Sequence, residues 1–307
     1  MTHASKATPS AQPTARKLLT ALRAFSLPVT LLPIVMAAAA VAPAGRWDWP
    51  VLIMCLLGAG GVSMCGNLLN DYFDFRSGAD RAMEDDRGRP GRLLVTGLLL
   101  PRHVLIEAIA CLAVGAICCG YVIARAGWPM AVFVAVGAAG AWAYTAPPVA
   151  LKRRRLGEPA IFVLYGPLLM VAAAWAQTHR LEPLALVLSA PVGMATTAIL
   201  VGNNFRDRRE DAQAGVRTLG QLADGRLARL LYVALVLASV LGFAAIGLLQ
   251  VGPWALVIAP LALVTLRGPL KAMVAGQRMA DIDARTARFG AILMLLVTIA
   301  YLVWAKH

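Results

Sequence analysis

Acidic residues are scarce in this chain, whose 307 residues include 16 Asp and Glu against 29 Lys and Arg. The four histidines are scattered along the chain and suggest no metal site; they are His3, His103, His179 and His307. All five cysteines fall inside apolar runs, as expected of small buried side chains. Their positions show neither the spacing of a metal site nor a disulfide framework. The positions of these residues argue against a metal centre built from histidine or cysteine.

Long uncharged runs dominate the chain, which is 59% hydrophobic and has a mean hydropathy of +0.69. A helix needs about 20 apolar residues to cross a bilayer, and it satisfies its own backbone hydrogen bonds there. The composition therefore predicts an all-α, polytopic membrane protein. Residues 1–15 are predicted to be a disordered cytoplasmic tail, and residues 16–307 a single membrane domain. Nine apolar segments are expected to span the bilayer: 24–44, 49–69, 104–124, 128–146, 159–177, 183–202, 228–248, 252–266 and 287–305.

The net charge of +13 is distributed unevenly along the chain. If the nine segments cross the membrane, 25 of the 29 Lys and Arg residues fall on one side and four on the other. Because Lys and Arg accumulate in cytoplasmic loops, the asymmetry places the N-terminus in the cytoplasm and the C-terminus outside. The charge thus indicates the topology of a multi-pass protein in a bacterial-type inner (plasma) membrane. No nucleic-acid partner is expected.

The few carboxylates are concentrated in two clusters, each at the cytoplasmic end of an apolar segment. The first contains Asp71, Asp74 and Asp80, and the second contains Asp207 and Asp211. Carboxylates are costly near hydrocarbon and usually mark a function there. Residues three or four apart share one helix face, so each cluster presents a pair of carboxylates. Because Mg²⁺ prefers oxygen ligands and bridges carboxylates to phosphates, these five residues predict a catalytic, Mg²⁺-dependent diphosphate site.

Polar and aromatic residues near the clusters complete the predicted site. Side chains expected to bind diphosphate oxygens are Asn70, Arg81, Lys152, Arg153, Asn203, Asn204 and Arg206. Side chains expected to face an isoprenoid tail and its carbocation are Tyr72, Phe73 and Tyr144. Plainer interpretations stay open for some residues. The basic run 152–155 is also a topology signal, and Asp281 and Asp283 fit a solvated loop.

These residues resemble the UbiA superfamily of intramembrane prenyltransferases over nearly the whole chain. The most specific match is residues 203–219, which contain the second acidic cluster. The first cluster resembles the branch that makes menaquinone and vitamin K, through the pattern Asn70-x-Tyr72-x-Asp74-x-x-x-Gly78-x-Asp80. The resemblance implies nine helices around a central cavity in a lipid bilayer. It also implies Mg²⁺ held by four carboxylates, here Asp74, Asp80, Asp207 and Asp211.

The implied reaction transfers a polyprenyl group from polyprenyl diphosphate to an aromatic acceptor, which in this branch is 1,4-dihydroxy-2-naphthoate. One alternative is the same fold with another acceptor, such as 4-hydroxybenzoate, homogentisate or a lipid phosphate. A second alternative is a transporter or lipid-binding protein, in which the acidic residues serve ion coupling. Transporter carboxylates tend to lie near the bilayer midplane in broken helices, whereas both clusters here lie at segment ends.

Overall fold

The computed structural model describes residues 26–41, 47–78, 92–146, 148–213, 215–250 and 255–304. These residues form a bundle of helices without a named strand, and one isolated bridge joins Arg154 to Arg217. The predicted all-α fold is confirmed. The predicted tail at residues 1–15 and the predicted site residues Asp80 and Arg81 lie outside the described residues.

The described residues contain the helices in the following order along the chain. The first half contains α2 (Leu27–Val41), α3 (Trp49–Ser77), α4 (Arg92–Val95), α5 (Pro101–Ala126), α6 (Trp128–Thr145) and the 3₁₀ helix η3 (Leu151–Arg153). One long helix follows, made of α7 (Gly157–Val163), the π-helical turn η4 (Leu164–Leu168) and α8 (Leu169–Thr178). The second half contains α9 (Pro183–Arg206), α10 (Arg208–Gln213), η5 (Leu219–Gly225), α11 (Arg226–Gln250), α12 (Ala255–Ala262), η6 (Leu263–Leu266), α13 (Arg267–Ala275) and α14 (Ile282–Trp304).

Within the described residues, seven helices are long and apolar enough to cross a membrane, and they coincide with seven of the nine predicted segments. Of the other two, predicted segment 24–44 contains α2, an apolar helix of 15 residues. Predicted segment 252–266 falls in α12 and η6, where the helix tightens into a 3₁₀ turn before α13. The multi-pass architecture is confirmed, while the count of nine spans stays a prediction.

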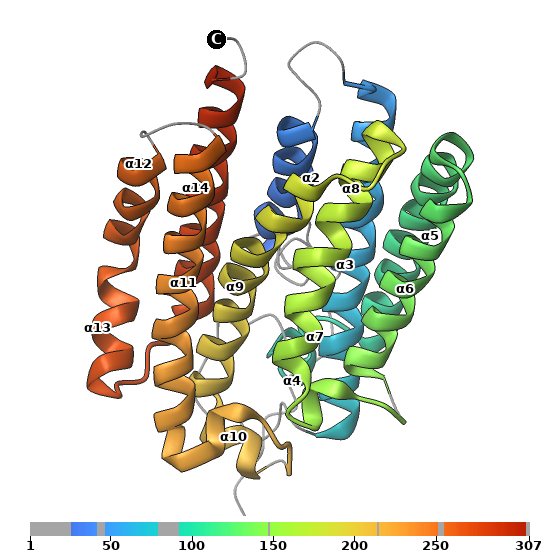
Figure 1. Cartoon of the computed structure of the whole chain (residues 1–307). Coiled ribbons are helices and arrows are strands. Elements are labelled where there is room, and N and C mark those ends of the chain that lie inside the picture. Colours follow the sequence, from blue (N-terminus) through green and yellow to red (C-terminus); the bar gives the residue numbers. More distant parts are fainter. Residues whose placement is uncertain are drawn as a thin grey trace, which may run out of the picture.

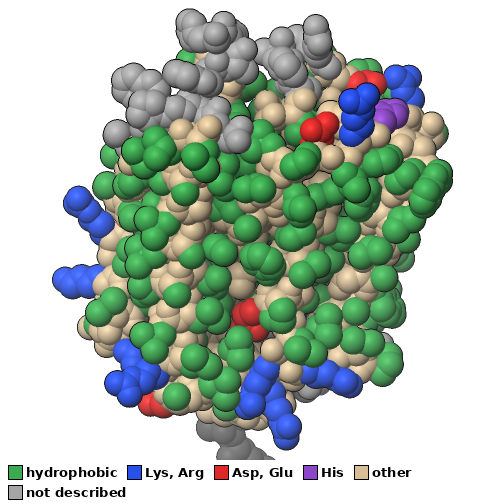
Figure 2. All heavy atoms as spheres, in the orientation of Figure 1, with side chains coloured by type: hydrophobic (Ala, Val, Ile, Leu, Met, Phe, Trp, Pro, Cys, Tyr) green, Lys and Arg blue, Asp and Glu red, His purple; other side chains and the backbone are tan. Residues whose placement is uncertain are grey.

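The outer surface of the bundle suits a lipid environment. Large apolar side chains are exposed along the outer helices, including Ile117 on α5, Trp128 on α6 and Leu241 on α11. Figure 2 shows hydrophobic side chains covering the belt between the two ends, with Lys and Arg gathered mainly at the lower end. Apolar patches of this extent are rare on soluble monomers and mark contact with membrane or partner.

The helices stand in two groups beside a central set (Figure 1). Helices α11 to α14 lie on one side and α5 and α6 on the other, with α2, α3, α8 and α9 between them. α3 packs along α5, α9 along α11, and α14 against both α2 and α9. The C-terminal ends of α3 and α9 and the N-terminal end of α14 therefore meet at one end of the bundle.

A close crossing between η4 and α9 fixes one wall of the interior of the bundle. Gly166 in η4 lies against α9, and a Cβ added there would approach the Ser189 carbonyl oxygen to 2.7 Å. Only glycine permits so short a distance between backbones. The π-helical turn widens the helix at the same place, as such turns do at kinks. The crossing sets the positions of Tyr165 and Leu169, which face the interior.

Polar contacts join α3, α5 and α8 at the opposite end of the bundle. Asp48 caps α3 by accepting from the Val51 amide at 3.1 Å, and it forms an ion pair with Arg125 at 2.9 Å. The Asp48 amide donates to Gln177 Oε1 at 3.0 Å. These bonds satisfy helix-end groups that would otherwise lack partners, and they hold three helices at fixed spacing.

Candidate active site

A cavity of about 700 Å³ lies between the helices and extends to the end that carries both acidic clusters. Much of its wall is apolar, and we call this part the apolar channel: Ile34, Met54, Val122, Met130, Phe133, Leu169 and Ala173. Polar residues gather at the other part of the wall, and we call them the polar mouth: Asn67, Asn70, Asp74, Lys152, Asn203, Asn204, Arg206, Asp207, Asp211 and Asp283. A single cavity thus combines the apolar channel with the strongly charged polar mouth.

On the α3 side of the polar mouth, Asp74 faces the cations of η3. Lys152 Nζ donates to both carboxylate oxygens of Asp74 at 2.8 Å, and Arg153 Nη2 donates to Oδ1 at 3.2 Å. Asn70 donates to Asp74 Oδ2 at 3.1 Å and accepts a bond from Lys152. The four-residue spacing places Asn70 and Asp74 on one helix face. The structure thus joins four predicted site residues in one network.

The backbone of the η3 loop directs the side chains of Lys152 and Arg153 toward α3. Ala150 has a positive φ of 42°, which turns the chain into η3. The Arg155 amide donates to the Arg217 carbonyl at 3.2 Å and ties the loop to the segment after α10. Lys152 consequently lines the cavity, whereas Arg154 is exposed. The basic run therefore contributes to the site as well as to the charge asymmetry.

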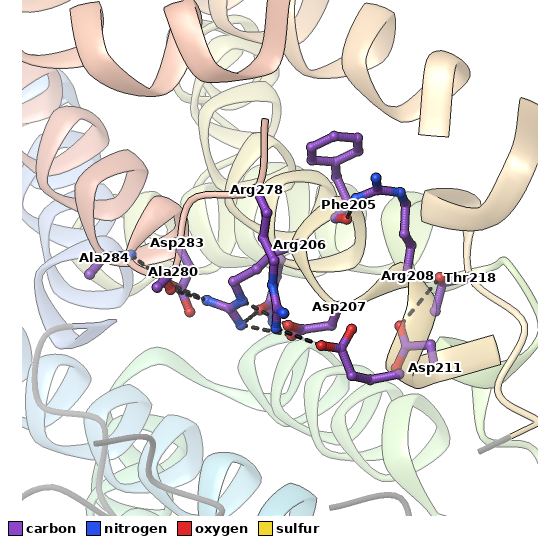
Figure 3. Close-up of polar contacts among 12 residues, drawn as sticks. Phe205, Arg206, Asp207, Arg208, Asp211, Thr218, Arg278, Ala280, Asp283 and Ala284 are labelled. Atoms are coloured by element: carbon purple, nitrogen blue, oxygen red, sulfur yellow. Dashed lines mark hydrogen bonds and ion pairs between the residues drawn. The ribbon is translucent and has the colours of Figure 1, made fainter. Parts of the chain in front are cut away.

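On the α9 side, Arg206 is the centre of a buried network (Figure 3). Its Nε and Nη2 donate to the two carboxylate oxygens of Asp207 at 2.8 Å each, and Nη2 also donates to Asn203 Oδ1. Its Nη1 lies 2.7 Å from Asp283 Oδ1 and 3.0 Å from the Ala280 carbonyl oxygen. The guanidinium group thus links the end of α9 to the start of α14.

Asp211 lies on α10, one turn beyond Asp207, and Thr218 Oγ1 donates to its Oδ2 at 3.4 Å. The pKa of Asp211 is raised to about 7, first by burial and then by the negative charge of Asp207. Lys152 opposes this rise in pKa and Asp74 adds to it. Because these charges come from α3, η3 and α9, the two acidic clusters lie within electrostatic reach of each other.

The polar mouth offers oxygen donors of the kind that Mg²⁺ prefers, on Asp74, Asp207 and Asp211. Among the described residues, no group of three or more His, Cys, Asp or Glu side chains is close enough to hold a metal ion. Mg²⁺ is usually held by one or two carboxylates, with substrate phosphates and water completing its shell. The donor set therefore fits Mg²⁺ that arrives with a diphosphate, rather than a closed protein cage.

Two predicted polar residues of α9 and one predicted aromatic residue line the cavity: Asn203, Asn204 and Tyr144. Asn204 Nδ2 also donates to Glu158 Oε1 at 2.8 Å, which ties α9 to the start of α7. The hydrogen bond orients the amide group, because one of its two N–H donors is committed to the carboxylate, while the amide keeps a second N–H.

Three predicted residues of α3 lie outside the cavity lining: Asp71, Tyr72 and Phe73. Asp71 is buried, and the rings of Tyr72 and Phe73 pack edge to face with centroids 5.6 Å apart. Successive residues of a helix turn by about 100°. Tyr72 therefore points opposite to the face that Asn70 and Asp74 share, whereas Asp71 and Phe73 lie at its two edges. Arg153 also lies outside the lining and reaches the site through Asp74.

Sequence reasoning missed two carboxylates at the polar mouth or beside it. Asp283 was expected in a solvated loop, yet it lies in the first turn of α14 and pairs with Arg206. Glu158 is buried beside the mouth as the acceptor for Asn204. A usable signal existed for Asp283, since it lies four residues before predicted segment 287–305, on the same predicted side of the membrane as both acidic clusters.

The fold and site define a polytopic helical membrane protein whose apolar cavity ends in a cluster of carboxylates and cations. The chain belongs to the UbiA prenyltransferase family, whose model matches residues 31–293. It is therefore a membrane prenyltransferase, and the resemblance stated above is confirmed.

Individual relatives agree with this membership. The chain is 33% identical to the 1,4-dihydroxy-2-naphthoate octaprenyltransferase of Mycobacterium tuberculosis, over 92% of each chain. It is 31% identical to UbiA prenyltransferase domain-containing protein 1 of Xenopus tropicalis, over 90% of this chain and 78% of the relative. A solved UbiA homologue of Archaeoglobus fulgidus, bound to GPP and Mg²⁺, shares the fold with a TM-score of 0.67 and 16% identity. That match covers 94% of this chain and 99% of the other.

Proposed function

We propose that this prenyltransferase is Mg²⁺-dependent and transfers a polyprenyl group from polyprenyl diphosphate to 1,4-dihydroxy-2-naphthoate, a step of menaquinone biosynthesis. The acceptor is supported by the naphthoate octaprenyltransferase relatives of Mycobacterium tuberculosis and Mycobacterium leprae, at 33% and 31% identity. The metal is supported by the A. fulgidus homologue, which binds Mg²⁺ together with GPP.

A single observation carries the proposal: carboxylates from α3, α9 and α10 converge with cations at the charged end of one apolar cavity. Asp74, Asp207 and Asp211 would hold Mg²⁺ there, together with Asp80 from the sequence pattern. When bound, Mg²⁺ would supply positive charge that neutralises the departing diphosphate. Asp71 has no assigned ligand role in this arrangement, because it lies outside the cavity lining.

Basic residues of η3 would bind the diphosphate oxygens. Lys152 and Arg153 now pair with Asp74, at 2.8 Å and 3.2 Å. When Asp74 turns to a metal ion, these two cations would need a new anion, and the diphosphate supplies one. Asn70 and Asn204 would add uncharged donors on either side, and Arg81 would extend the set from the loop after α3.

The apolar channel would hold the isoprenoid tail, with Tyr144 at its charged end facing the allylic carbon. The allylic C–O bond breaks and its electron pair leaves with the diphosphate. A ring carbon of the acceptor supplies the electron pair of the new C–C bond. With 1,4-dihydroxy-2-naphthoate, the ring carboxylate leaves as CO₂, and the electron pair of that bond restores the aromatic ring.

Acceptor competition in a purified system tests this proposal. The protein, reconstituted in lipid nanodiscs with Mg²⁺ and one prenyl diphosphate, receives equal concentrations of the naphthoate, 4-hydroxybenzoate and homogentisate. We expect mass spectrometry to find the prenylated naphthoate product first, and no product with EDTA. Consumption of another acceptor with the naphthoate untouched would overturn the acceptor alone. Absence of product from every acceptor would overturn the reaction.

We also propose that the polar mouth faces the cytoplasm, together with the N-terminus. The support is the distribution of Lys and Arg, with 25 residues on the side of the acidic clusters and four on the other. Topology reporters inserted after Asp80 and after Asp211 are expected to report the cytoplasmic side, and one fused after His307 the opposite side. Reporters showing Asp80 and Asp211 on opposite faces would rule out a shared diphosphate site.

A further inference from the structure

The guanidinium group of Arg206 is committed to protein partners on every nitrogen. A guanidinium group carries five N–H donors: one on Nε and two on each Nη. In this structure four protein acceptors receive hydrogen bonds from Arg206: both oxygens of Asp207, Asn203 Oδ1 and the Ala280 carbonyl oxygen. Its Nη1 also forms an ion pair with Asp283 Oδ1 at 2.7 Å. The Arg206 side chain is also 6% exposed. A diphosphate contact would have to break one of these buried bonds.

The bond to Asp283 comes from a different helix and is held in place independently. Asp283 Oδ1 also accepts from the Ala284 amide at 2.9 Å, in the first turn of α14. A carboxylate is favoured there because backbone N–H groups and the helix dipole present partial positive charge. Figure 3 shows Asp283 and Asp207 on either side of the Arg206 guanidinium group. Asp283 at the start of α14 thus forms an ion pair with Arg206, and Arg206 in turn donates two hydrogen bonds to Asp207.

We propose that Asp283 and Arg206 form a positioning pair: Asp283 fixes the guanidinium group, which in turn orients the Asp207 carboxylate toward Mg²⁺. This role rests on the proposed Mg²⁺-dependent function and replaces the predicted diphosphate contact of Arg206. Partners that hydrogen-bond a metal-ligating carboxylate fix its orientation, and losing one typically costs about 10–100-fold in metal affinity. The network also demands arginine, since a lysine ammonium has all its donors on one nitrogen and cannot reach Asp207 and Asp283 together.

The chain offers a matched control two residues away. Asp281, just before α14, is 54% exposed and also lines the cavity, but its carboxylate forms an ion pair with Arg285 at 2.7 Å instead of with Arg206. Asp281→Asn removes the same charge from the same helix start as Asp283→Asn, but it leaves the Arg206 network intact. A general electrostatic effect of α14 would therefore appear in both variants, whereas a positioning effect would appear in one.

The experiment measures binding, without turnover, of an unreactive thiodiphosphate analogue of the prenyl donor to purified protein at increasing Mg²⁺. We expect Asp283→Asn to raise the Mg²⁺ concentration for half-maximal analogue binding by at least about tenfold. Without Mg²⁺, the affinity of Asp283→Asn for the analogue is expected to stay within about twofold of wild type. For Asp281→Asn, both the half-maximal Mg²⁺ concentration and the metal-free affinity are expected to stay within about twofold of wild type. Arg206→Lys should behave like Asp283→Asn, and Asp283→Glu, which keeps the charge, should partly restore wild-type behaviour.

Opposite outcomes overturn the inference. If Asp283→Asn needs no more Mg²⁺ than wild type, Asp283 does not position the site. If Arg206→Lys keeps the Mg²⁺ requirement but weakens metal-free binding of the analogue, Arg206 is a direct diphosphate ligand. Should Asp283→Asn fail to accumulate as folded protein, Arg206→Lys and Asp283→Glu carry the same test. Failure of wild type itself to show Mg²⁺-dependent binding would instead overturn the proposed function.

Discussion

The polar mouth and the apolar channel belong to one cavity but are built under different constraints. In the mouth, the charged groups described above have specific partners at bonding distance, and these partners come from α3, η3, α9 and α14. In the channel, the wall residues are held by packing, as the buried Ile34, Val122 and Met130 illustrate. A buried charge is costly unless it is paired, whereas an apolar wall needs only suitable volume. Single substitutions should therefore have large effects at the mouth and graded effects in the channel.

The largest effect is expected from removing a carboxylate of the mouth. Asp74→Asn or Asp207→Asn should lower product formation about a thousandfold, because charge stabilisation of a leaving group is worth several kcal/mol. Product is measured by mass spectrometry at saturating Mg²⁺. Asp48→Asn, which breaks an ion pair at the other end of the bundle, should leave activity within a few fold. Near-normal turnover by Asp74→Asn would contradict the assignment.

A smaller loss is expected from the cation opposite Asp74. Lys152→Gln should raise the KM for prenyl diphosphate about 10–100-fold, the value of one or two charge-assisted hydrogen bonds. Arg154→Gln is the matched control, since Arg154 lies in the same loop but is exposed. Steady-state kinetics with varied donor concentration separate KM from kcat. Equal KM values for the two variants would show that the basic run acts through net charge alone.

The pH dependence of Mg²⁺ activation should follow Asp211, whose pKa is raised to about 7. Below that pH the carboxyl is protonated, and Mg²⁺ must displace the proton. The half-activating Mg²⁺ concentration should therefore rise by up to about tenfold for each pH unit below 7 and level off above it. Activity is measured over Mg²⁺ titrations between pH 5.5 and about 8.5. In Asp211→Asn the dependence should disappear, and its persistence would assign the titration to another group.

The smallest and most selective effect is expected in the channel. Ala173 is a buried wall residue of α8, and Ala173→Leu would extend side-chain volume into the cavity. Short prenyl donors should react nearly as in wild type, while kcat/KM for long donors should fall several-fold; the Mg²⁺ requirement should not change. Ala139→Leu, on the exposed face of α6, is the control. An equal loss for short and long donors would mean that the substitution disturbs the fold instead.

Much of this protein could be predicted from local sequence patterns. Seven long apolar helices occur where uninterrupted hydrophobic segments predicted them. The four-residue spacing of Asn70 and Asp74 placed both on one face, because helix periodicity is a local property. The same periodicity, applied strictly, would have turned Tyr72 away from that face, as the structure does.

Sequence alone determined the membrane fold, the two acidic clusters and their basic surroundings, because apolar length, helix periodicity and charge asymmetry are properties of short stretches. Tertiary structure decided which side chains meet. Asp283 is 77 residues from Arg206 in the sequence, and no local pattern pairs them; the pairing arises because α14 packs against α9. Lys152 reaches Asp74 for the same kind of reason, through a loop fixed by its bond to Arg217. Long-range contacts depend on how helices pack, which single-helix patterns do not specify.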